Sequence, residues 1–71
     1  MSSFTEAVRS SLMSEWRTTG EIADAIPARG VSHNSHMSNV CRVLRLMVRD
    51  GLAEGRMVRT GRGATKEWRR T

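Results

Sequence analysis

The pattern of apolar and polar positions predicts an amphipathic helix near the start of the chain. Its apolar residues recur every three or four positions over residues 4–13, so they share one face of a helix. Ser2 and Ser3 precede this stripe and carry side-chain oxygens of the kind that cap helix N-termini. The apolar positions are Phe4, Ala7, Val8 and Leu12.

A second, shorter helix is predicted over residues 19–26. Thr18 and Glu21 have the spacing of a capping box, in which each side chain accepts a hydrogen bond from the backbone N–H of the other residue. Pro27 ends the helix because proline disfavours the α region for the residue before it. A polar turn follows, with Gly30 as its expected left-handed position. The apolar stripe consists of Ile22, Ala23, Ala25 and Ile26.

A third helix is predicted over residues 35–49. Asn34 or Ser35 supplies its N-cap, and Asp50 followed by Gly51 supplies its stop. Its apolar stripe has the spacing of a core-facing helix and contains Met37, Val40, Cys41, Leu44, Met47 and Val48. At about 100° per residue the opposite face carries Ser35, Ser38, Arg42, Arg45 and Arg49, with Asn39 and Leu46 at its margin.

After Gly51 the pattern changes to that of a β-hairpin over residues 52–70. Two segments, which contain Val58, Thr60, Thr65 and Trp68, are separated by a turn at residues 61–64. Leu52, Val58 and Trp68 are expected to face the core. Three cations, Arg59, Arg62 and Lys66, are expected to gather around the turn.

Length and composition predict one small soluble domain spanning residues 1–71. With 38% apolar and 27% charged residues the chain is expected to fold, but 71 residues are too few for a multi-layer enzyme fold. No apolar run approaches the roughly 18 residues of a membrane span, and no signal peptide is evident, so a cytoplasmic protein is expected. Cys41 is the single cysteine, which excludes an internal disulfide and a paired-cysteine zinc site.

The charge is distributed unevenly along the chain. Residues 1–41 carry three arginines against four acidic residues, whereas residues 42–71 carry nine basic residues against three acidic ones, within a total of +5. Eleven of the twelve cations are arginine, whose planar fork suits phosphates and guanine edges. This asymmetry is typical of nucleic-acid binding, driven by counterion release. A solvated basic surface, or the arginine bias of a GC-rich genome, is the alternative interpretation.

Three helices followed by a hairpin, with a basic third helix and a basic turn, resemble the winged helix-turn-helix family. The sharpest part of the resemblance is the segment 40–52, VCRVLRLMVRDGL, in which an apolar stripe and a charged face precede Gly-Leu at the entry to the wing. The resemblance implies an α+β fold with a C-terminal wing. It also implies double-stranded DNA as the partner and a role as a small transcriptional regulator.

The resemblance assigns roles to individual residues. The third helix lies in the major groove, where Asn39 is suited to adenine and Arg42 and Arg45 to guanine, while Arg49 lies near phosphates. The start of the second helix lies near the DNA backbone. The expected contacts are Ser35, His36, Ser38, Asn39, Arg42, Arg45 and Arg49 on the third helix, Arg59, Arg62 and Lys66 on the wing, and Thr18 and Thr19 at the second helix.

The sequence departs from the family at two places. The turn from Pro27 to Asn34 is about four residues longer than the usual one, which makes His33 a candidate turn-specific contact. Winged-helix domains that bind left-handed DNA share the Arg-Val-Leu of residues 42–44 and a tryptophan in the last strand. Cys41 and Arg45 replace the asparagine and tyrosine of those domains, so that specialised activity is not expected.

Other function classes have less support. His33, His36 and Cys41 lack the spacing of metal ligands, and no catalytic set is evident, so neither an enzyme nor a cofactor is expected. The aromatic residues and Met13, Met47 and Met57 are assigned to the core. The alternative function is a protein-interaction module in a larger assembly, favoured by the exposure expected for Val43 and Leu46. A monomer or weak homodimer is expected, nucleoid-associated if the host is bacterial or archaeal.

Overall fold

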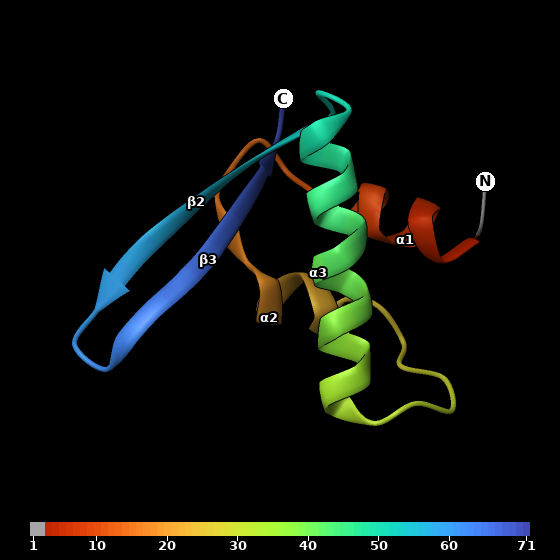
Figure 1. The fold of residues 1–71 in the computed structure, drawn as a ribbon. Helices are drawn as coiled ribbons and strands as arrows, with labels where there is room; N and C mark the ends of the chain where they lie inside the picture. The colour runs from red at the N-terminus through yellow and green to blue at the C-terminus, as the bar shows by residue number, and fades with distance from the viewer. Residues whose placement is uncertain (1–2) are drawn as a thin grey trace.

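Three helices lie on one side of a three-stranded antiparallel sheet, and the first of them packs on the other two helices rather than on the strands (Figure 1). The computed structural model describes residues 3–71, so the proposed cap Ser2 lies outside the described residues. The sheet order is β1-β3-β2, which makes the last strand of the chain the central one. The elements are α1 (Ser3–Ser11), β1 (Arg17–Thr18), α2 (Thr19–Asp24), α3 (His33–Arg49), β2 (Ala53–Thr60) and β3 (Gly63–Arg70).

The α+β class predicted from the sequence is confirmed, with shifted helix ends. Helices α1 and α2 each end two residues earlier than predicted. The capping box at the start of α2 is present: Thr18 N donates to Glu21 Oε1 at 2.9 Å, and Glu21 N donates to Thr18 Oγ1 at 3.1 Å. This pair places the beginning of α2 directly after β1.

Helix α3 begins at His33, two residues earlier than predicted, because Ser32 is its N-cap. Ser32 Oγ accepts a hydrogen bond from the backbone N–H of Ser35 at 3.2 Å, a role that the sequence assigned to Asn34 or Ser35. The other end closes as a Schellman motif, in which Leu52 N donates to Met47 O at 2.8 Å. Gly51 has a φ of 78°, a left-handed conformation that suits glycine.

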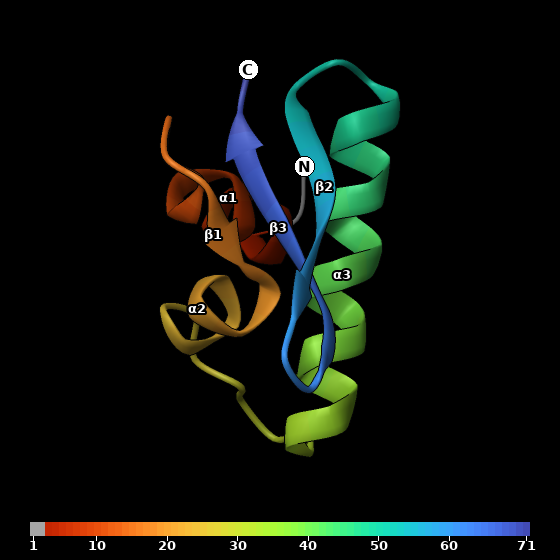
Figure 2. The same ribbon diagram turned by 90° about the vertical axis from the view of Figure 1, so that its left-hand side faces the viewer.

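Residues 25–32 form the long connection between α2 and α3 (Figure 2). Gly30 adopts the left-handed conformation expected for it, with a φ of 71°. The connection leaves the end of α2 and reaches the first turn of α3 without forming a helix or a strand. The connection is as long as the turn predicted from Pro27 to Asn34, but it begins and ends two residues earlier.

The hairpin formed by β2 and β3 has two different faces. Cross-strand partners share a face, and Gly55 pairs with Trp68 while Met57 pairs with Lys66. We call the face of Ala53, Gly55, Met57, Arg59, Ala64, Lys66, Trp68 and Arg70 the inner face, because Ala53 and Trp68 are buried against the helices. The outer face carries Glu54, Arg56, Val58, Thr65, Glu67 and Arg69.

This register corrects two core predictions and adds a strand. Val58 pairs with Thr65 on the outer face, and Leu52 is 41% exposed, so neither shares the buried position of Trp68. The turn consists of Gly61 and Arg62 alone, since Thr60 pairs with Gly63. Strand β1, which the sequence did not predict, pairs Arg17 with Trp68.

The core lies between the helices and the inner face. Of the methionines assigned to it, Met47 is buried, whereas Met13 and Met57 are 47% and 62% exposed. Cys41 is half-buried beside the core as a free thiol. The buried apolar residues are Val8, Leu12, Ile22, Ala23, Ile26, Val40, Leu44, Met47, Ala53 and Trp68.

Candidate nucleic-acid interface

The exposed face of α3 matches the face predicted from the sequence. A helix rises about 1.5 Å per residue, so the stretch from Ser35 to Arg49 extends for about 21 Å. Leu46, at the margin, is 45% exposed, and Asn39 is half-buried. The predicted polar and basic residues of this face are all exposed: Ser35, Ser38, Arg42, Arg45 and Arg49.

The cations of α3 are held only weakly by the rest of the protein. Arg42 Nη2 donates to Asn39 Oδ1 at 3.4 Å, at the long end of a hydrogen bond. Arg49 Nε lies 3.7 Å from Asp50 Oδ1, and the Arg49 side chain is 74% exposed. Within residues 3–71, Arg45 forms no ion pair. These guanidiniums are therefore accessible to an external anion.

The hairpin and α1 lie on opposite sides of α3 (Figure 1). Val43 and Leu46 line a shallow groove with Thr5 and Arg9, so this flank of α3 faces α1. At 100° per residue, Arg45 then points to the flank nearer the hairpin. Arg42 projects from the middle of the exposed face.

The inner face of the hairpin continues beyond the core as a basic surface. Arg59 lies on this face opposite Ala64, and Arg62 lies in the turn. Lys66 Nζ lies 4.7 Å from the centre of the Trp68 ring, a cation–π contact that keeps the ammonium on the inner face. The hairpin turn and the N-terminal half of α3 lie at the same end of the molecule (Figures 1 and 2).

The outer face of the hairpin holds its cations in ion pairs. Arg56 Nη2 lies 2.7 Å from Glu67 Oε1, and Arg69 Nη2 lies 3.2 Å from Glu54 Oε2. Both guanidiniums also lie over the Trp16 ring, at 4.2 and 4.6 Å from its centroid. Trp16 was assigned to the core from the sequence; instead it is half-buried, with two arginines over its ring.

His36 is the clearest correction to the predicted site. It is only 4% exposed, and its Nε2 lies 2.9 Å from the carbonyl oxygen of Ala23, which links α3 to α2. Phe4 from α1 packs edge-on against its ring, with centroids 6.1 Å apart. His36 is thus a structural residue. His33, the turn-specific candidate, is exposed at the first position of α3.

Thr18 and Thr19, the expected backbone contacts, both have structural partners. Thr18 caps α2, as described above, and Thr19 Oγ1 accepts a hydrogen bond from Trp68 Nε1 at 2.8 Å. The hydrogen bond from the Thr18 N–H, followed by that from the Thr18 side chain and the charge of Arg17, lowers the pKa of Glu21. The geometry explains both threonines without a nucleic acid.

Residues 3–71 contain no group of three or more His, Cys, Asp or Glu side chains placed to hold a metal ion. No helix in this range is long and apolar enough to cross a membrane. Comparisons with protein-family models, curated proteins and solved structures find no match.

Proposed function

We propose that the chain binds double-stranded DNA as a winged helix-turn-helix domain, with α3 in the major groove and the hairpin as the wing. One observation carries the proposal: the C-terminal cations on the outer face of the hairpin are in ion pairs, whereas those on the other surfaces are accessible. Those on the outer face, Arg56 and Arg69, are paired with glutamates. Those on α3, in the hairpin turn and on the inner face remain accessible to an anion, and neutralising phosphates with such cations drives DNA association.

Each part of the surface has a distinct role. Arg42 and Arg45 lie in the middle of α3 and would contact guanine edges, with Ser35, Ser38 and Asn39 at the N-terminal end reaching other bases. Arg49, at the C-terminal end, would contact phosphate. On the wing, Arg59, Arg62 and Lys66 would contact phosphate or the adjacent groove. A small DNA-binding domain of this kind suits a transcriptional regulator.

The test is fluorescence anisotropy with labelled duplex DNA between about 50 and 200 mM salt, where electrostatic affinity falls steeply. A triple variant, Arg42→Gln, Arg45→Gln and Arg62→Gln, is expected to weaken binding by about tenfold or more and to flatten the salt dependence. Single-stranded DNA and RNA of the same length are measured alongside.

A matched control variant has the same net charge as this triple variant. Arg9→Gln, Arg29→Gln and Arg56→Gln removes three exposed arginines that lie outside the proposed surface. This variant is expected to retain most of the affinity of the unmodified chain. Equal losses in the two triple variants would mean that the chain attracts polyanions by net charge alone, and the proposal would be rejected.

A second candidate function rests on the groove between α1 and α3. Leu46 and Leu52 line it and are 45% and 41% exposed, with Arg9 and Asp50 also lining it. Val43, expected to be exposed, is half-buried there. A surface of this kind suits a protein partner in a larger assembly. Absence of duplex binding by the unmodified chain even at low salt would favour this second function.

A further inference from the structure

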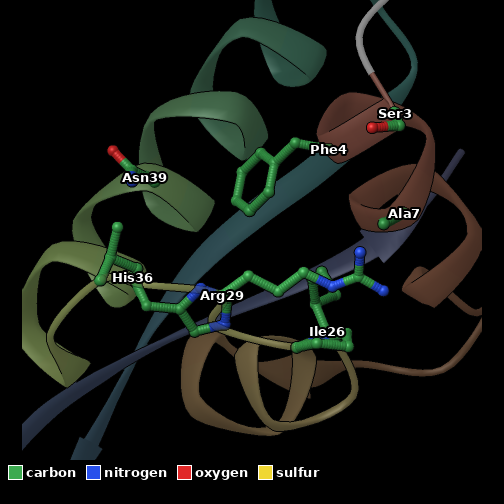
Figure 3. Close-up of a pocket in the computed structure, with 9 residues that line it drawn as sticks. Ser3, Phe4, Ala7, Ile26, Arg29, His36 and Asn39 are labelled. Atoms are coloured by element: carbon green, nitrogen blue, oxygen red, sulfur yellow. The ribbon is translucent and has the colours of Figure 1, made fainter.

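A cavity of about 390 Å³ lies between α1, the 25–32 connection and the N-terminal half of α3 (Figure 3). Cavities of roughly 300–1,000 Å³ are typical of sites for small organic ligands. The walls are largely apolar. The lining consists of Ser3, Phe4, Ala7, Ile26, Pro27, Arg29, Val31, His36 and Asn39.

Arg29 gives this cavity a positive charge that the protein does not neutralise. Within residues 3–71, Arg29 forms no ion pair, and none of the described lining residues is acidic. Figure 3 shows its side chain extending across the cavity between α3 and α1. A ligand that bears one anionic group matches this arrangement.

His36 adds a polar atom to the wall. Its Nε2 is occupied by the Ala23 carbonyl, and Nδ1, on the other side of the ring, has no partner within residues 3–71. The residue as a whole is 4% exposed. His36 lines the cavity, so its ring forms part of the wall beside Phe4.

The walls favour a planar apolar body. The Phe4 ring stands at 77° to the His36 ring, so a second aromatic ring can pack against the face of one and the edge of the other. Ile26, Pro27 and Val31 supply aliphatic surface around them. We propose that this cavity binds a small aromatic carboxylate, with the carboxylate on Arg29 and the ring system against Phe4 and His36.

The proposal is independent of DNA binding and is tested by amide chemical-shift titration of the ¹⁵N-labelled chain at about 150 mM salt, where unspecific attraction is screened. The probe is 2-naphthoate, and 2-naphthamide is its uncharged control. Naphthoate is expected to shift the amides of Phe4, Val31 and His36 in a saturable manner. The amide analogue is expected to bind about tenfold more weakly, because it lacks the charge that pairs with Arg29.

Variants distinguish binding of naphthoate in the cavity from attraction by the net charge of the protein. Arg29→Gln is expected to lose about tenfold in naphthoate affinity and Arg29→Lys to regain part of it, while Arg59→Gln on the hairpin leaves it unchanged. Arg29 is exposed in a connection, so unchanged peak dispersion is expected and is checked in the same spectra. The proposal is overturned if naphthoate causes no saturable shifts, if the shifts map to the exposed face of α3, or if Arg29→Gln binds as tightly as the unmodified chain.

Discussion

Trp68 Nε1 donates a hydrogen bond to Thr19 Oγ1 at 2.8 Å, joining the central strand to the first residue of α2. Trp68 is 1% exposed, so its N–H has no access to water once this partner is lost. Thr19→Val keeps the shape of the side chain but removes the acceptor, and we expect it to cost about 1–3 kcal/mol of stability. Urea unfolding measures this, with Thr19→Ser as the control that retains the bond. A Thr19→Val chain as stable as the unmodified one would contradict the assignment.

Trp68 lies opposite Gly55 on the neighbouring strand and leaves no room for a side chain there. A Cβ at this position would lie 3.0 Å from Trp68 Cζ3 and 3.1 Å from Cε3, inside normal van der Waals contact. Because the ring is buried, we expect Gly55→Ala to destabilise the protein by about 1–3 kcal/mol. Gly61→Ala is the control, since a Cβ there meets no atom within 4 Å. Thermal unfolding of both variants decides the matter, and equal midpoints would refute the close packing.

The ion pairs of the outer face predict that arginines of equal charge differ in their effect on DNA binding. We expect Arg62→Gln to weaken duplex binding and to reduce the slope of log K against log salt by about one phosphate contact, or 0.9. Arg56→Gln changes net charge equally but removes a cation already paired with Glu67, so its slope stays near that of the unmodified chain. Identical slopes for the two variants would show that the sorting of cations by face does not govern binding.

His36 is expected to affect stability through packing and its hydrogen bond. His36→Ala removes the ring between Phe4 and Ala23 and leaves a cavity, with an expected loss of about 2–4 kcal/mol. Asn34→Ala, on the exposed first turn of the same helix, is the control and is expected to change stability by less than about 0.5 kcal/mol. Chemical unfolding provides the readout, and a small loss for His36→Ala would contradict its structural role.

The capping box predicts a pH dependence at the start of α2. The pKa of Glu21 is lowered mainly by the hydrogen bond from the Thr18 N–H, so the folded state favours the carboxylate. The contribution is present above the ordinary glutamate pKa of about 4.3 and is lost as pH falls through the lower folded value. Glu21→Gln removes this portion of the acid sensitivity. Stability curves between about pH 2 and 6 test it, and parallel curves for the two chains would rule it out.

The helices and their caps were predictable because their signals are local. Apolar stripes at three- and four-residue spacing located all three helices, and Thr18 with Glu21 located the start of α2. His36 was also readable: it lies four residues before Val40 and eight before Leu44, on the buried stripe of α3. Its polar side chain obscured that position.

The sheet register was not predictable in the same way. β1 contains only Arg17 and Thr18, and its pairing with β3 joins segments far apart in the chain. Alternation along β2 admitted either face for Val58, and only the pairing of Gly55 with Trp68 decides between them. This register also determines which arginines pair with Glu54 and Glu67, and therefore which cations remain unpaired in the candidate site.

The two faces of the hairpin differ in net charge, because Arg56 and Arg69, which lie over the Trp16 ring, are paired with Glu67 and Glu54. Two guanidiniums and two carboxylates cancel on the outer face, while the inner face and the turn retain their positive charge. Positive charge is therefore concentrated on one side of the hairpin, and the fold fixes its direction. A polyanion that approaches from a distance exerts a torque on such a charge distribution and rotates the α3 side toward itself before contact. If the chain binds DNA as proposed, Glu54 and Glu67 would thus help to orient the encounter from the face that points away from the proposed surface.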